Sequence, residues 1–270
     1  MELFDTHFHF DGEKTPQEYL VDIQNGLALV QEKLNIVPER IFLLCAGGSF
    51  SSSVRAQEFA RSVDNAFFAA GVHPHDAGEY RMNREDFSFF SGAPRLVAVG
   101  EIGLDYFYDY SDRKVQRDVM AEFLELALQW KLPAMLHLRD QENVFNAYDD
   151  ALAMLRDFSA AGGRFVIHCY AGNGKYAEKF LELGAFFGVT GLYTFKAATN
   201  IRDAISLIPT ERLLIETDSP YLAPVPFRGR VNTPGLVGLV AAALGADRNM
   251  TPEAASDIFT ANGKKFYGIN

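Results

Sequence analysis

The feature of this sequence that most constrains its fold is the regular return of apolar runs of strand length. Most of these runs are nearly continuous in apolarity and rich in β-branched or aromatic residues, which is typical of strands covered on both faces. We therefore expect a parallel sheet buried between helices. The expected strands cover residues 2–10, 41–46, 66–73, 96–102, 133–138, 165–170, 185–190 and 213–218.

Helical patterns separate these runs. Residues 15–18 (TPQE) form a capping box with proline at the first helical position, which predicts a helix to about residue 34. The non-periodic stretches 47–55 and 219–235 are expected to be loops at the active end. Further helices are expected at 113–131, 142–160, 174–183, 200–207, 234–244 and 252–267.

The alternation of strands with helices favours an α/β fold. Eight strands favour a closed barrel over an open sheet, and 270 residues suit a TIM-type barrel, which needs about 250. We therefore expect one domain over residues 1–270, a single parallel (β/α)8 TIM-type barrel with its active site at the carboxyl ends of the strands.

Charge and cysteine content narrow the functional classes. The net charge of −10 argues against a protein that coats DNA through a broad basic face, although a metal centre could bind a nucleic-acid end locally. The two cysteines, Cys45 and Cys169, lie in apolar runs without a C-x-x-C motif, which suits a reducing compartment. With no basic leader and no apolar stretch of about 20 residues, we expect a cytoplasmic monomer without a membrane span.

The histidines all fall at or just past the carboxyl end of an expected strand, which is the catalytic end of a β/α barrel. His7 and His9 are two residues apart on a strand, so they share a face and can both reach one ion. Alone, this pair would equally suit two ordinary strand histidines, but the histidines on other strands argue against that interpretation. The six histidines are His7, His9, His73, His75, His137 and His168.

Carboxylates join the histidines. Glu101 is expected to end the strand 96–102, and Asp218 the strand 213–218. A buried carboxylate without a partner costs several kcal/mol, so each should be paired or bound to a metal. The alternative is that the carboxylate pairs with an arginine or a backbone amide. For two other carboxylates, Glu216 and Asp5, this structural pairing and a role in the site carry about equal weight.

Four imidazoles and two carboxylates suit two divalent ions, which could bind a phosphodiester and lower the pKa of a water toward neutrality. Imidazole favours zinc and similar ions, whereas carboxylate favours magnesium or manganese, so the choice among Mg, Mn and Zn stays open.

Eight sequence blocks carry a resemblance to a known family. They are DTHFH at 5–9, GVHPHD at 71–76, GEIGLDY at 100–106, HLRD at 137–140, HCY at 168–170, ETDSPYL at 216–222, PFRG at 226–229 and AN at 261–262. In order and spacing the chain resembles the TatD-type metal-dependent deoxyribonucleases, a branch of the amidohydrolase-like barrels.

This resemblance implies a TIM-type barrel and a hydrolase that acts on DNA ends, often 3′→5′ on single strands. It implies Glu101 and Asp218 as catalytic residues, with Asp218 also able to accept the proton of the attacking water. The implied metal ligands are His7, His9 and Asp218 for one ion, His137 and His168 for a second, and Glu101 bridging both.

Residues in the matching blocks also suggest contacts to phosphate or base. They are His75, Arg139, Tyr170 and Arg228. An arginine fork matches phosphate geometry, but a structural ion pair is an equal alternative for both arginines. The roles of His73 and His75 are less secure, and both are expected near the pocket rather than on a metal.

Two other enzyme classes share such barrels. Amidohydrolases and lactonases often bridge their metals with a carboxylated lysine on the fourth strand, where this chain has Glu101. That difference favours a phosphodiesterase, while cleavage of an aminoacyl-tRNA ester stays open. A non-catalytic relict barrel would lack a ligand, and no ligand is missing from the sequence.

Overall fold

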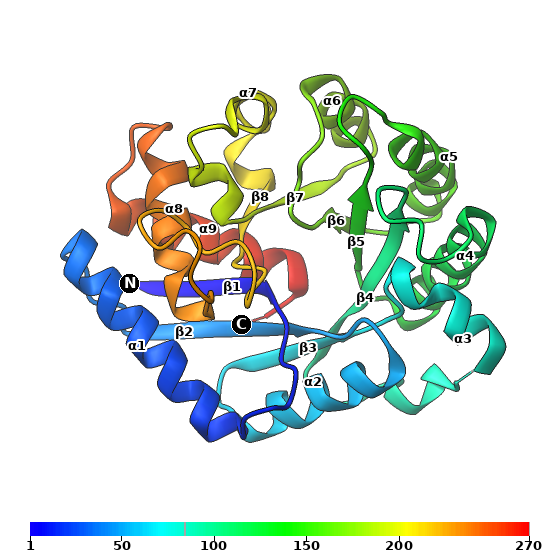
Figure 1. Ribbon diagram of the computed structural model, residues 1–270, viewed down its shortest axis with the longest axis horizontal. Coiled ribbons are helices and arrows are strands. Elements are labelled where there is room, and N and C mark those ends of the chain that lie inside the picture. Colours follow the sequence, from blue (N-terminus) through cyan, green and yellow to red (C-terminus); the bar gives the residue numbers. More distant parts are fainter. Residues whose placement is uncertain (84, 270) are drawn as a thin grey trace.

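The computed structural model describes residues 1–83 and 85–269, which form a β/α barrel (Figure 1). Within these residues eight strands pair in parallel and in sequence order around one sheet, which confirms the expected α/β class and (β/α)8 barrel. A bridge between Phe8 and Ser219 joins the first strand to the segment after the last. The strands are β1 (Glu2–Phe8), β2 (Arg40–Ala46), β3 (Ala66–Ala70), β4 (Leu96–Asp105), β5 (Ala134–Arg139), β6 (Phe165–Ile167), β7 (Phe186–Val189) and β8 (Leu213–Ile215).

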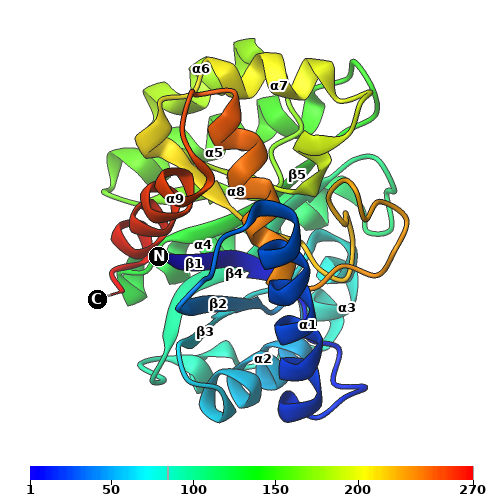
Figure 2. The same cartoon turned by 90° about the vertical axis from the view of Figure 1, so that its left-hand side faces the viewer.

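Helices surround the strands, and Figure 2 shows α8 and α9 on the side where the two chain ends lie close together. None of the helices formed by the described residues is long and apolar enough to cross a membrane. The α-helices are α1 (Pro16–Leu34), α2 (Phe50–Ser62), α3 (Ala77–Asn83), α4 (Arg113–Trp130), α5 (Asn146–Ala160), α6 (Gly174–Glu182), α7 (Thr199–Ser206), α8 (Val237–Ala246) and α9 (Pro252–Tyr267).

Several sequence expectations about elements were wrong. The strand expected at 213–218 ends at Ile215, so Asp218 lies beyond β8 and does not end it. Residues 47–55 are not all loop, because Ser49 accepts a hydrogen bond from the Ser52 backbone and α2 begins at Phe50. The serine-rich run hid this capping box, which uses a serine in place of the usual glutamate. The short helix α3 was not expected. β4 runs on to Asp105, so Glu101 lies inside the strand and not at its end.

The core has two layers that follow the alternation of strand side chains. The larger cluster packs the outer face of the sheet against the helices. A second cluster joins alternate strand residues such as Phe4, Met135 and Leu214 inside the barrel. Phe266 and Tyr267, at the end of α9, belong to this inner cluster and close it at the amino ends of the strands.

Irregular register turns functional side chains into the barrel. In β1 the pairing shifts between Asp5 and Phe8, so that Phe8 packs outward against Phe59 of α2, with ring centroids 5.4 Å apart, while His7 faces inward on Met135. In β4 the pairing shifts between residues 99 and 102. One extra residue reverses which side chains face inward, and both shifts occur beside a predicted metal ligand.

Gly103 holds the end of β4 close to β5. Its φ is +145°, and a Cβ on this residue would overlap the backbone carbonyl oxygen of His137. We expect Gly103→Ala to lower the free energy of unfolding by about 3 kcal/mol or more, because backbone atoms rather than a flexible side chain would have to move. Urea denaturation followed by circular dichroism measures this loss.

Gly184→Ala is the matched control, because Gly184 also has a positive φ, +83°, but open space where a Cβ would lie. It should cost only the conformational strain of about 1–2 kcal/mol. Equal losses in the two variants would contradict the close approach of β4 to β5.

Candidate metal centre

The predicted ligands meet at the carboxyl end of the barrel, although they come from strands far apart in the sequence. Three of them lie on strands, namely His7 on β1, Glu101 on β4 and His137 on β5. His9 and His168 directly follow β1 and β6, and Asp218 lies three residues beyond the end of β8. His75 departs from its expected place, because it lies on a short 3-10 helix, η1 (Pro74–Asp76), beyond β3. The residues brought together are His7, His9, Glu101, His137, His168 and Asp218.

A first cluster combines two imidazoles with two carboxylates. The Nε2 atoms of His7 and His9 lie 3.2 Å apart. Glu101 Oε2 lies 3.4 Å from the His7 nitrogen and 3.6 Å from the His9 nitrogen. Asp218 Oδ1 lies 3.7 and 3.4 Å from the same two nitrogens. Two imidazole nitrogens that face the same carboxylate oxygens suit one shared cation.

A second cluster uses the other oxygen of Glu101. Glu101 Oε1 lies 3.0 Å from His137 Nδ1 and 3.4 Å from His168 Nε2. The Glu101 side chain is 2% exposed, so both of its oxygens are taken up by these histidines rather than by solvent. A single carboxylate thus presents one oxygen to each cluster, as a ligand bridging two ions would.

Two further carboxylates orient the histidines of the second cluster. Asp105 Oδ2 lies 3.1 Å from His137 Nε2, and Glu216 Oε1 lies 3.0 Å from His168 Nδ1. A neutral imidazole whose N–H donates a hydrogen bond to the orienting carboxylate keeps a lone pair on its other nitrogen, which faces Glu101. Metal-binding histidines commonly have such carboxylate partners, so the donor set fits divalent cations.

His73 differs from these two histidines. Its Nε2 lies 3.7 Å from Glu101 Oε1, within reach of an ion shared with Glu101 and His137. Its Nδ1, however, accepts a hydrogen bond from the backbone N–H of His75 at 3.2 Å. With this bond in place a neutral ring carries its proton on Nε2, which favours the expectation that His73 lies beside a metal rather than on one.

The electrostatics of the centre favour positive charge. Burial raises the pKa of Glu101, but the imidazoles, His168 foremost, outweigh burial and hold this pKa well below its usual range. Burial lowers the pKa of His168, yet Glu101 and Glu216 together raise it to about 10. The carboxylates therefore stabilise positive charge where the nitrogens converge, and a cation bound there would displace protons.

The residues predicted to contact the substrate differ in how close they lie to the metal centre and in how exposed they are. His75 Nε2 lies 2.9 Å from Asp105 Oδ2, at the edge of the centre. Arg139 and Arg228 are exposed, and neither forms an ion pair within the described part of the chain. They stack instead, with Arg139 4.4 Å from the centroid of Phe107 and Arg228 4.4 Å from that of Phe195.

Tyr170 does not reach the centre. It is 2% exposed, and its hydroxyl donates to the backbone oxygen of Asn173 at 2.7 Å. This residue is therefore part of the barrel wall, and the structure gives no support to a substrate contact there.

Asp105 is a site residue that the sequence did not identify, whereas Glu216 is one for which a site role and a structural pairing carried equal weight. Asp105 follows Glu101 by four residues on the same strand, so the alternation of side chains placed both on one face. That spacing was a usable signal. Asp5, by contrast, is fully buried and accepts hydrogen bonds from the backbone and hydroxyl of Thr217, so it serves to join β1 to the segment after β8.

Comparisons with known proteins agree with this arrangement. The family described as TatD related DNase matches residues 4–268. A Bacillus subtilis protein named uncharacterized metal-dependent hydrolase YabD is 32% identical over 271 residues, covering 99% of this chain and 100% of its own length. The Citrobacter rodentium protein named 3'-5' ssDNA/RNA exonuclease TatD is 31% identical over 233 residues, covering 84% and 86% of the two chains.

A solved structure extends this likeness to three dimensions. The crystal structure of YJJV, a TatD homologue from Escherichia coli K12, superposes with a TM-score of 0.79 at 26% identity, over 99% of this chain and 98% of that one. The match spans the whole barrel, including every strand that carries a predicted ligand. This chain belongs to the TatD-related DNase family of metal-dependent hydrolases.

Proposed function

We propose that this protein is a two-metal phosphodiesterase that removes nucleotides from the ends of single-stranded DNA. The observation that carries the proposal is the buried carboxylate of Glu101, with one oxygen facing each of two nitrogen clusters. The name of the Citrobacter relative, an exonuclease for single-stranded DNA and RNA, supports this substrate class.

The proposal assigns the donors of the two clusters to two ions. When bound, two divalent cations (Mg, Mn or Zn) would lower the pKa of a water and offset the charge of the phosphate. The assigned ligands are His7, His9 and Asp218 for the first ion, His137 and His168 for the second, and Glu101 for both.

Asp218 is the better placed of the two catalytic carboxylates to take up a proton. Its side chain is 15% exposed, against 2% for Glu101, so it is the carboxylate that a water can approach. Burial raises the Asp218 pKa, but a hydrogen bond with His9 and nearby imidazoles bring it below its usual value. We infer that Asp218 is ionised at neutral pH and accepts the proton of the attacking water.

The first prediction from this proposal concerns Glu101, the carboxylate assigned to both ions. Glu101→Gln keeps the size of the side chain but removes its charge, so phosphodiester cleavage should be abolished while the fold stays intact. The assay is release of label from 3′-labelled single-stranded DNA across a titration of Mg²⁺, Mn²⁺ and Zn²⁺, beside ester and lactone substrates. Glu253→Gln, on the surface of α9, is the matched control. Full activity of Glu101→Gln would rule out the bridged pair, and cleavage of the esters alone would point to the other enzyme classes.

The second prediction separates the two ions. Asp105→Asn places an amide where His137 Nε2 now meets a carboxylate, so the second ion should bind about 10- to 100-fold more weakly. The first ion, bound by residues that do not contact Asp105, should keep its affinity. Titration calorimetry of the metal-free protein measures both affinities, with the exposed Asp203→Asn of α7 as control. An equal loss at both sites would contradict this assignment of the ligands.

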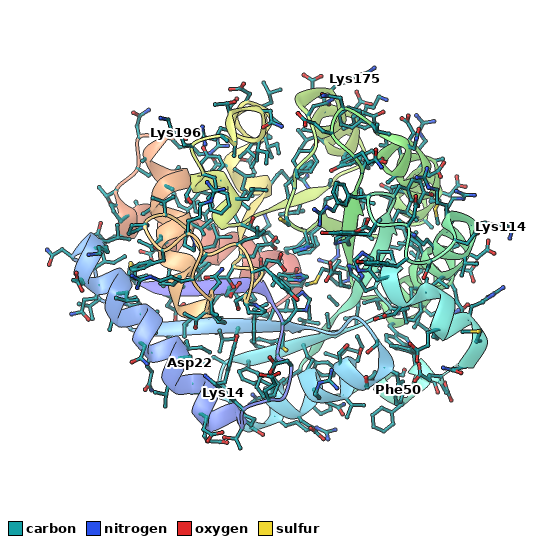
Figure 3. The ribbon with its side chains drawn as sticks, viewed as in Figure 1. Lys14, Asp22, Phe50, Lys114, Lys175 and Lys196 are labelled. Atoms are coloured by element: carbon teal, nitrogen blue, oxygen red, sulfur yellow. The ribbon has the colours of Figure 1, made fainter. Side chains whose placement is uncertain are left out.

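A third prediction follows from the charge. The chain carries −10 overall, and Figure 3 shows Lys114 and Lys175 pointing outward from the helical layer, away from the strands. Without metal, long duplex DNA should therefore bind weakly at physiological salt. Fluorescence anisotropy with a chelator present measures this binding, and a tight, salt-sensitive complex would contradict the expectation.

A further inference from the structure

Three aromatic side chains are exposed just beyond β4. The exposed fractions of Phe107, Tyr108 and Tyr110 are 41%, 43% and 69%. In the described part of the chain the other exposed phenylalanine and tyrosine residues are Phe89 and Tyr221. Aromatic side chains normally bury most of their surface, so three exposed rings within four residues indicate a surface that binds something. We call Phe107, Tyr108 and Tyr110 the aromatic platform.

The platform is held in place by the residue that orients the metal centre. Asp105 Oδ1 accepts hydrogen bonds from the backbone N–H of Phe107 at 2.9 Å and of Tyr108 at 3.0 Å. Arg113 adds bonds to the backbone oxygen of Tyr106 at 3.3 Å and to Asp109 at 2.9 Å. The backbone that carries these rings is therefore held in place relative to the centre before any ligand arrives, which lowers the entropy lost on binding.

The platform lies beside the metal centre. The rings of Tyr108 and Tyr110 are parallel within 2°, with centroids 5.3 Å apart. The ring of His75 meets Tyr110 edge-on at 4.8 Å and meets His73 at 4.3 Å, and His73 lies 3.7 Å from Glu101. Two ring contacts thus connect Tyr110 to the histidine that borders the bridging carboxylate.

A cation accompanies the rings. The guanidinium of Arg139 lies 4.4 Å from the centroid of Phe107 and 4.8 Å from that of Tyr108. Stacked aromatic rings combined with an arginine are the usual means by which proteins bind single-stranded nucleic acid without reading its sequence. In a chain with a net charge of −10, such stacking can supply affinity that does not depend on a broad basic groove.

We propose that the aromatic platform stacks a nucleobase adjacent to the phosphate that is cleaved at the metal centre. This inference rests on the proposed function and adds to it a binding subsite. A base can lie on Tyr110 only when it has left its own stack, so the platform selects unpaired ends. It also makes cleavage tolerant of sequence, because every base has a π-face.

The test compares the metal-loaded enzyme with Tyr110→Ala and Tyr108→Ala on a short single-stranded oligodeoxynucleotide. A second oligonucleotide has abasic nucleotides on both sides of the terminal linkage. We expect each alanine variant to raise KM for the intact strand by roughly 5- to 150-fold, the range for loss of one base–aromatic stack, with a smaller change in kcat. Tyr110→Phe, which keeps the ring, should restore the wild-type KM.

The abasic strand turns this comparison into a double-mutant cycle. It should raise KM for the wild-type enzyme as much as Tyr110→Ala does, and should cause little further change in that variant. Phe89→Ala is the matched control, because Phe89 is 59% exposed and its ring packs on Phe50, which Figure 3 shows at the outer side of the molecule. Its KM should equal that of the wild type.

The outcomes separate the two proposals. Wild-type cleavage of the oligonucleotide with an unchanged KM in both alanine variants would overturn the platform and leave the proposed function standing. The KM would also be unchanged in both variants if the rings bound a protein partner instead of the nucleic acid. A loss on both strands to the same degree would also overturn it, because the base would then not be the group contacted. A wild-type enzyme that cleaves neither strand would overturn the proposed function, and the platform with it.

Discussion

The arrangement of the site depends on the negative charge of Glu101, which is buried and must be compensated by neighbouring groups. This carboxylate is 2% exposed, and imidazole nitrogens of His7, His9, His73, His137 and His168 lie within 3.7 Å of its oxygens. An uncompensated charge at this depth would cost several kcal/mol, so the ends of β1, β4 and β5 and the segments after β3 and β6 are constrained together. The barrel supplies this constraint, because the carboxyl ends of its strands meet at one place.

The backbone departs from regularity where this constraint acts. Register shifts in β1 and β4 turn ligand side chains inward while their neighbours, such as Phe8, stay in the outer core. Asp105 and Glu216 then fix the rings of His137 and His168. Asp105 also holds the backbone of the aromatic platform, so one buried carboxylate positions both a predicted metal ligand, His137, and the segment that carries the exposed rings.

The sequence predicted the fold, and it predicted which side chains would meet at one end of the barrel, because both rest on local patterns. Nearly continuous apolar runs identified every strand, and histidines at their ends identified the centre. The sequence was weaker where spatial contacts decide. Glu101 lies within β4 because the strand continues past a register shift, and Tyr170 turns into the wall to reach the oxygen of Asn173. The exposure of Phe107, Tyr108 and Tyr110 has no sequence signal, because the same residues would read equally well as core.

Under the proposed function, an acidic protein acts on a polyanion, so its attraction for the substrate must be local. Long-range repulsion between the negative protein and the densely charged phosphates of a duplex weakens duplex binding. The same repulsion matters less for one terminal phosphate that lies within about a Debye length of the centre. The carboxylates keep that centre receptive to cations, and stacking requires no charge at all. Few phosphates would then be contacted, so affinity for a strand should depend only weakly on salt. Under the proposed function, the net negative charge would act as a filter, because it would disfavour duplex segments while a frayed, unpaired end could still reach the centre.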